Sequence, residues 1–170
     1  FPEGSSAAQS QPFCNNANAA IRLSVWKAHP YDETLTGLED LAWAKEVQSA
    51  GSQVWYVAEA EVVHVHNETP CSVLNRYRRE AMAFKRIYPE AHFSLYDFVR
   101  MASANIASDL WHAARSRQFW RNLFSIFWFR TAQFWGTYQG YRRSLEWNWN
   151  LRQRFYYPHG MEMLEKPAPR

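Results

Sequence analysis

The sequence predicts an α/β fold, with a small strand-bearing part followed by a mostly α-helical part. Two short runs of β-branched and aromatic residues within VWYVAEAEVVHVH have the composition of strands. Helical patterns precede and follow them, and after residue 68 they continue for about a hundred residues. Because two short strands do not form a stable sheet alone, they are expected to complete a larger sheet.

Loop and cap residues place the elements of the first part. Asn16 or Asn18 is suited to cap a helix, and HPYDETLTG is expected to form a loop. The apolar pattern that follows predicts an amphipathic helix ending at Gly51, since glycine is frequent just past a helix. The expected elements are a loop over 1–12, a helix over 17–27, a helix over 38–51, and strands over 53–57 and 61–66.

The second part is expected to contain three helices. Thr69-Pro70 has the pattern of a cap followed by proline at the first helical position, and Pro89 is expected to stop that helix. Further helices are expected over about 94–116 and 119–145, followed by an irregular tail.

Composition and charge separate the two parts. With 47% hydrophobic and 21% charged residues, the 170-residue chain is globular rather than disordered. Residues 1–68 carry 3 basic and 9 acidic side chains, whereas the remainder carries 16 and 7. The acidic part suits metal, sugar or proton chemistry, and the basic, aromatic part suits anionic lipid or another polyanion. Charge alone would allow nucleic acid, but the chain has no reader motif, so nucleic acid is not expected. The two cysteines, Cys14 and Cys71, form no CxxC pair and favour a reducing cytosol.

The stretch GLEDLAWAK places two carboxylates at the start of a helix. Glu39 and Asp40 need no function to be explained, because a helix N-terminus stabilises negative charge. Alternatively, Asp40 lies beside Trp43 at the rim of an apolar helix, where it could accept a proton from a hydroxyl nucleophile.

Two further motifs have both a structural and a functional interpretation. In HVHNET, His64 and His66 would share one face of a strand and could bind a divalent ion, although two ligands are too few for a firm site. In FCNNANAAIR, the Asn side chains could cap a helix, or they could present amides to a polyhydroxylated ligand.

The aromatic stretch FWRNLFSIFWFRTAQFWGTYQGYRR is interrupted by polar residues and falls short of a membrane-spanning helix. Trp and Phe together with Arg fit a helix that lies in a membrane interface. A buried helix and a homo-oligomer contact fit the same pattern. The candidate interface residues are Trp120, Arg121, Trp128, Arg130 and Trp135.

Three pieces, taken in order, resemble a known family. FCNNANAAIRLSVW, PYDETLTGLEDLAWAKEVQSAG and VWYVAEAEVVHVHNET are similar to the second half of the catalytic domain of family 2 glycosyltransferases of the GT-A fold. The likeness is greatest to bacterial, rhamnosyltransferase-like enzymes of surface-polysaccharide synthesis. It implies an acceptor-side half of a GT-A domain over residues 1–88 and a helical, basic extension over 89–170.

The resemblance implies a role for each candidate residue. Asp40 would be the general base of an inverting sugar transfer. Glu39, Asn16, Asn18 and Trp43 would bind or support the acceptor.

The resemblance also implies a cofactor and partners. His64, with His66 as the fallback, would bind a divalent cation, Mn²⁺ or Mg²⁺. The donor would be a nucleotide-diphospho-sugar and the acceptor a glycan or lipid-linked glycan. The expected location is cytoplasmic, peripheral to the inner face of the bacterial plasma membrane.

The family's nucleotide-binding half and its Asp-x-Asp motif do not occur in this sequence. The chain is therefore expected to be a fragment that transfers no sugar by itself. The alternative function is a non-catalytic, membrane-associated helical interaction module.

Overall fold

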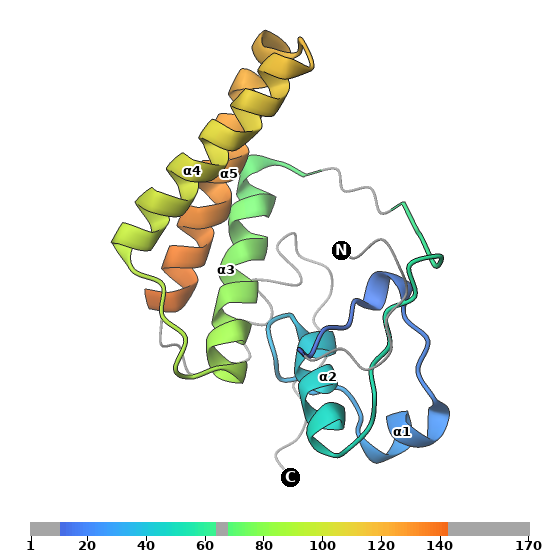
Figure 1. Cartoon of the computed structure of the whole chain (residues 1–170). Coiled ribbons are helices and arrows are strands. Elements are labelled where there is room, and N and C mark those ends of the chain that lie inside the picture. The colour runs from blue at the N-terminus through green and yellow to red at the C-terminus, as the bar shows by residue number, and fades with distance from the viewer. Residues whose placement is uncertain (1–10, 64–67, 143–170) are drawn as a thin grey trace, which may run out of the picture. The chain divides into compact units, whose positions relative to one another are not determined.

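The computed structural model describes residues 11–63 and 68–142. The chain divides into two compact units, Phe1–Asn67 and Glu68–Arg170. The first unit contains the short 3-10 helix η1 (Asn16–Asn18) and the helices α1 (Leu23–Ala28) and α2 (Glu39–Ser49). The second unit contains α3 (Pro70–Ile87), α4 (Leu95–Arg115) and α5 (Phe119–Arg142) (Figure 1).

The expected α/β fold is wrong, because the described residues form helices and no strand. Residues 53–57 keep the expected alternation: Val54 packs on the core of α2, while Trp55 and Val57 are 61% and 51% exposed. A strand needs several consecutive residues bonded to a neighbouring strand, and within 53–57 only Tyr56 is assigned an isolated β-bridge. The second expected strand, 61–66, forms no strand over 61–63, and the rest lies outside the described residues.

The first expected helix is shorter than its pattern indicated. The Asn15 side chain accepts a hydrogen bond from the backbone N–H of Ala17 (Oδ1···N 3.0 Å), which closes a local turn. Side chains of this kind compete with helix formation. Ala19 and Arg22 are extended, so α1 begins only at Leu23. The next helix agrees with its prediction: α2 ends at Ser49, two residues before Gly51, which has a φ of 87°.

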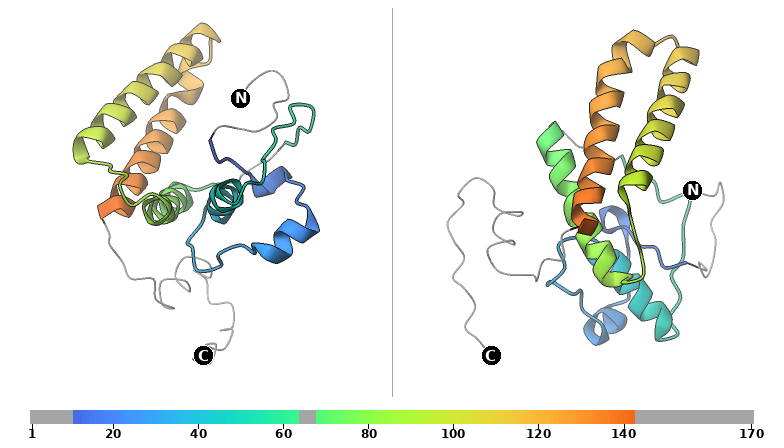
Figure 2. Two further views of the ribbon diagram at one scale, coloured as in Figure 1. Left: turned by 60° about the horizontal axis from the view of Figure 1, so that its bottom comes forward. Right: turned by 90° about the vertical axis from the view of Figure 1, so that its left-hand side faces the viewer.

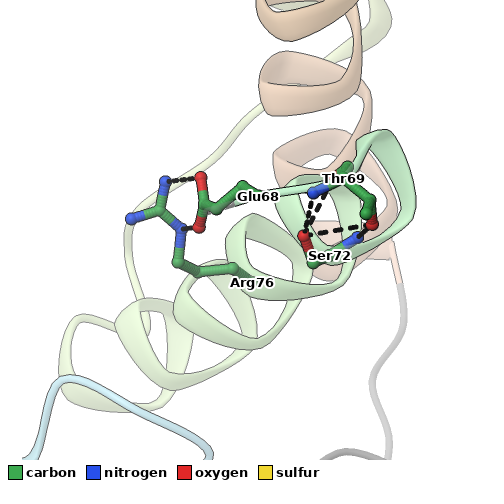
Figure 3. A network of polar contacts seen from close by, with 4 residues as sticks. All are labelled: Glu68, Thr69, Ser72 and Arg76. Atoms are coloured by element: carbon green, nitrogen blue, oxygen red, sulfur yellow. Dashed lines mark hydrogen bonds and ion pairs between the residues drawn. The ribbon is translucent and has the colours of Figure 1, made fainter. Parts of the chain in front are cut away.

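The N-terminus of α3 confirms the cap predicted at Thr69-Pro70. The Thr69 hydroxyl accepts from the Ser72 N–H (3.2 Å), and the Ser72 hydroxyl accepts from the Thr69 N–H (2.8 Å). This reciprocal capping box satisfies two backbone donors that a helix start leaves open. Beside it, Arg76 and Glu68 form an ion pair with Nε···Oε1 and Nη2···Oε2 distances of 3.0 Å (Figure 3).

The two helices that follow also agree with their predicted ranges as far as residue 142, since the predicted residues 143–145 lie outside the described ones. Ser94 caps α4 through a second capping box with Asp97, and α4 and α5 form an antiparallel hairpin (Figure 2). Within this unit, α5 contacts both α3 and α4.

Small residues on α5 allow α3 to approach closely. Ala132, Gly136 and Gly140 are buried and recur every fourth residue, so they share one face of α5. A Cβ added at Gly136 would lie 2.5 Å from the Leu74 carbonyl oxygen, and one at Gly140 would lie 2.5 Å from the Arg78 carbonyl oxygen. The backbones of α3 and α5 therefore pack at a distance that only glycine permits at these two positions.

Candidate functional site

Asp40 lies in the first turn of α2, directly after an unusual backbone conformation. Leu38, the N-cap residue, has φ 58° and ψ 29°, in the left-handed region. This region is costly for a residue with a Cβ. Leucine also has no oxygen with which to cap the helix, and the Asp40 carboxylate accepts from the backbone N–H of Leu41 (Oδ1···N 2.8 Å). The carboxylate is therefore fixed at the start of the helix.

The structure brings Asp40 to Asn16, the second predicted site residue. The backbone N–H of Asn16 donates to Asp40 Oδ2 at 3.0 Å, joining positions 24 residues apart. The Asn16 side chain in turn accepts from the Tyr31 hydroxyl (Oδ1···O 2.5 Å). Asn16, Tyr31 and Asp40 form the Asp40 cluster.

The surroundings of Tyr31 keep its hydroxyl protonated. Burial raises the pKa of Tyr31; the Cys14 thiol, once it is ionised at high pH, and the carboxylates of Asp40 and Glu39 raise it further. At neutral pH the phenol therefore remains a hydrogen-bond donor to Asn16. The pKa of Cys14 is also raised, first by burial and then by Asp40, so its thiol stays protonated and is a poor nucleophile.

Asp40 retains capacity to accept further hydrogen bonds. Its residue is half-buried, and each carboxylate oxygen accepts one backbone N–H. An ionised carboxylate has about four lone-pair sites, so about two remain for other donors. A hydroxyl that reaches this carboxylate can thus donate to it while both backbone bonds persist.

Trp43 supports the cluster from the core of the first unit. It is 7% exposed, and its indole N–H donates to the His29 carbonyl oxygen (2.7 Å). The Tyr31 ring packs edge-on against Trp43 and Trp26, with centroid separations of 6.0 Å and 4.6 Å. Burial and this hydrogen bond fix the position of Trp43, and the Tyr31 ring packs against it.

The other two predicted acceptor residues lie close by. Glu39 is half-buried in the first turn of α2, next to Asp40. The amide of Asn18 donates to the Ala60 carbonyl oxygen (Nδ2···O 2.5 Å), which ties η1 to the segment after α2. Tyr31 was not predicted as a site residue. It is the aromatic residue of the loop PYDETLTG, which lies between the motif with Asn16 and the helix start with Asp40.

The described residues contain no candidate metal site, and the two predicted histidine ligands are not among them. Neither unit gathers three His, Cys, Asp or Glu side chains into a group that could hold an ion, within the residues described. His64 and His66 lie outside those residues. Binding of Mn²⁺ or Mg²⁺ remains a prediction.

The five residues predicted for an interface divide into two groups. Trp120 is 84% exposed and Arg121 is exposed. In contrast, the Arg130 guanidinium forms an ion pair with Asp109 (Nε···Oδ2 2.6 Å), which raises the pKa of Arg130. Trp135 packs edge-on against Phe98 at 5.3 Å, and Trp128 is half-buried beside Phe129.

No helix in the described ranges combines the length and the apolar character needed to cross a membrane. Comparisons with known proteins gave no match to a protein-family model, a curated protein or a solved structure.

Proposed function

We propose that this chain supplies the general base for inverting transfer of a sugar from a nucleotide-diphospho-sugar to a glycan or lipid-linked acceptor. The observation that supports it best is the contact between the Asn16 N–H and the Asp40 carboxylate. It joins two of the three motifs that carry the resemblance to glycosyltransferases, at the one residue for which that resemblance implies catalysis.

In the proposed step, Asp40 takes the proton of the acceptor hydroxyl. The acceptor oxygen bonds to the anomeric carbon from the face opposite the diphosphate. The bond from that carbon to the diphosphate oxygen breaks, and the nucleoside diphosphate leaves with the electron pair. The configuration at the anomeric carbon inverts. Asn16 acts as a positioning residue, since its backbone N–H donates to the carboxylate, and Tyr31 acts through Asn16 by donating to its side chain.

The test replaces Asp40 in the organism that makes the chain, so that any partner the reaction needs is present. Membranes from cells carrying Asp40→Asn are assayed for incorporation of labelled sugar from nucleotide sugars. We expect a loss of about 10²–10⁴-fold, the usual contribution of a general base. Glu39→Gln is the matched control, because it removes the neighbouring carboxylate; transfer should change less than about tenfold. Transfer near the wild-type rate in Asp40→Asn would refute the role of Asp40.

A non-catalytic, membrane-associated helical module is the second candidate. The exposed aromatic and basic residues of α4 and α5 favour it. It predicts normal transfer in Asp40→Asn cells. A peripheral location at the inner face of the bacterial plasma membrane is compatible with both candidates.

A further inference from the structure

The end of the α4–α5 hairpin exposes large aromatic side chains. Trp120 is 84% exposed, Phe124 78%, Trp111 63% and Phe127 57%. Isolated exposed apolar residues are ordinary, but several large ones together indicate a contact surface. With the neighbouring cations they form the hairpin tip, which consists of Trp111, Arg115, Arg117, Trp120, Arg121, Phe124 and Phe127.

The three most exposed aromatic residues of α5 lie on one face, near the end of the helix that extends past α3. Trp120, Phe124 and Phe127 have the spacing i, i+4 and i+7, which places them in one stripe. Further along α5, the Phe129 ring meets Tyr77 of α3 with the ring centroids 6.4 Å apart. Figures 1 and 2 show the hairpin extending past the end of α3 within this unit.

The charge of the tip has one sign. Between Leu110 and Phe129 the sequence contains three arginines and no Asp or Glu. The preceding carboxylate, Asp109, is bound to Arg130. The tip arginines make no ion pair with any carboxylate in the described part of the chain. Their charge is therefore available to an anionic partner.

The turn of the hairpin keeps an arginine where glycine is usual. Arg117 has φ 57°, and the turn has the two hydrogen bonds of a Schellman motif, from Gln118 N to Ala113 O (2.8 Å) and from Arg117 N to Ala114 O (3.1 Å). Glycine at this position would avoid the steric cost of the left-handed conformation. The arginine thus costs stability, while it adds a cation to the most exposed end of the unit.

We propose that the hairpin tip docks onto the surface of a bilayer that contains anionic phospholipid. Exposed Trp and Phe suit the boundary between headgroups and acyl chains, and the surrounding arginines suit the headgroup phosphates. A protein groove would match the aromatic stripe equally well, but it would not account for three cations without a carboxylate. This inference goes beyond the proposed function and does not depend on Asp40.

The experiment measures flotation of the purified chain with vesicles. One set contains phosphatidylcholine alone, and the other contains about 30 mol% phosphatidylglycerol. We expect binding only to the anionic set and a fall in binding as salt rises from about 0.1 M to about 0.5 M. Replacement of all three tip arginines by serine should lower partitioning on the order of a hundredfold, since each cation near the surface contributes about fivefold. Trp120→Ala should lower it about tenfold.

Matched controls use the opposite end of α4. Tyr96 is 72% exposed, and Arg100 is exposed and lies 3.9 Å from Asp97, so Tyr96→Ala and Arg100→Ser change similar groups away from the tip. Both should bind as the wild type does. Arg117→Gly gives a second, independent readout: it should raise the melting temperature while it lowers vesicle binding.

Three results would overturn the proposal. The first is equal binding to neutral and anionic vesicles, and the second is unchanged binding by the tip variants. The third is a wild-type dimer that Trp120→Ala dissociates without vesicles, which would assign the tip to a second copy of the chain. Asp40→Asn should float normally, so a failed sugar transfer and a failed membrane contact can be told apart.

Discussion

The contacts that hold each unit together internally are of different kinds in the two units. In the first, long-range hydrogen bonds connect short elements, as between Asn16 and Asp40 or between Trp43 and His29, around a core of Trp43, Ala44 and Val47. In the second, helices of 18 to 24 residues pack through the small residues Ala132, Gly136 and Gly140 of α5 and through aromatic contacts.

The difference separates positioning from packing. Polar contacts in the first unit orient a carboxylate, and their strength depends on direction. The close packing of α3 on α5 depends on shape, and the hairpin tip takes no part in it. Breaking each kind of contact should therefore affect one unit more than the other.

The largest effect is expected from Trp43→Ala. Truncation of a buried Trp costs about 3–5 kcal/mol, and here it also leaves the His29 carbonyl oxygen without its indole donor. Amide hydrogen exchange, followed by mass spectrometry, should show lost protection in α2 and retained protection in α3 and α5. Equal loss in both units would mean that they unfold together.

A smaller effect, in the other unit, is expected from Gly140→Ala. The new methyl group would lie 2.5 Å from the Arg78 carbonyl oxygen and 2.6 Å from the Ala81 Cβ, so α3 and α5 must move apart. Overpacking of this kind costs about 1–3 kcal/mol. Chemical denaturation gives the free energy of unfolding, with exposed Ser103→Ala as the control, expected within about 0.5 kcal/mol of the wild type. A stability equal to that control would argue against the close approach of the two helices.

The smallest effect concerns pH and the start of α4. The Asp97 carboxylate accepts hydrogen bonds from the Ser94 hydroxyl (2.7 Å) and the Ser94 N–H (2.9 Å), which lower the pKa of Asp97 from its usual 3.8. Because the folded pKa is below the unfolded one, this stabilisation is present above the unfolded pKa and is lost as pH falls through the folded value.

Hydrogen exchange at the first turn of α4 should therefore quicken between about pH 5 and about pH 2. The quickening, corrected for the intrinsic exchange rate, should be weaker in Asp97→Asn. An identical pH profile in the two proteins would remove Asp97 as the cause.

The sequence predicted α2 to α5 well because their ends carry local signals. Thr69-Pro70 and Pro89 bracket α3 within the chain itself, so no distant partner is needed to place it. Strand formation at 53–57 could not be predicted from local signals. The alternation of Val54, Trp55 and Tyr56 shows which side chains face the core, but it does not show whether a neighbouring strand is present.

The candidate site was only partly predictable. Asp40 and Asn16 were recognised from their motifs, but their contact depends on the turn at Asn15 and on the path of the loop before α2. Tyr31 entered the cluster through that loop, whose conformation no local pattern specifies. The sequence also did not reveal which residues of α5 are exposed and which are covered, since only the positions of α3 and Asp109 show this.

The left-handed conformation of Leu38 has a consequence for the direction of the Asp40 carboxylate. Successive residues of an α-helix are rotated by about 100° about its axis. If α2 gained or lost one residue at its start, the preceding chain would meet the helix at a different angle, and Asp40 would turn away from Asn16. The left-handed conformation of residue 38 prevents α2 from extending backwards, so it fixes the residue at which the helix begins and, with it, the direction of the Asp40 carboxylate.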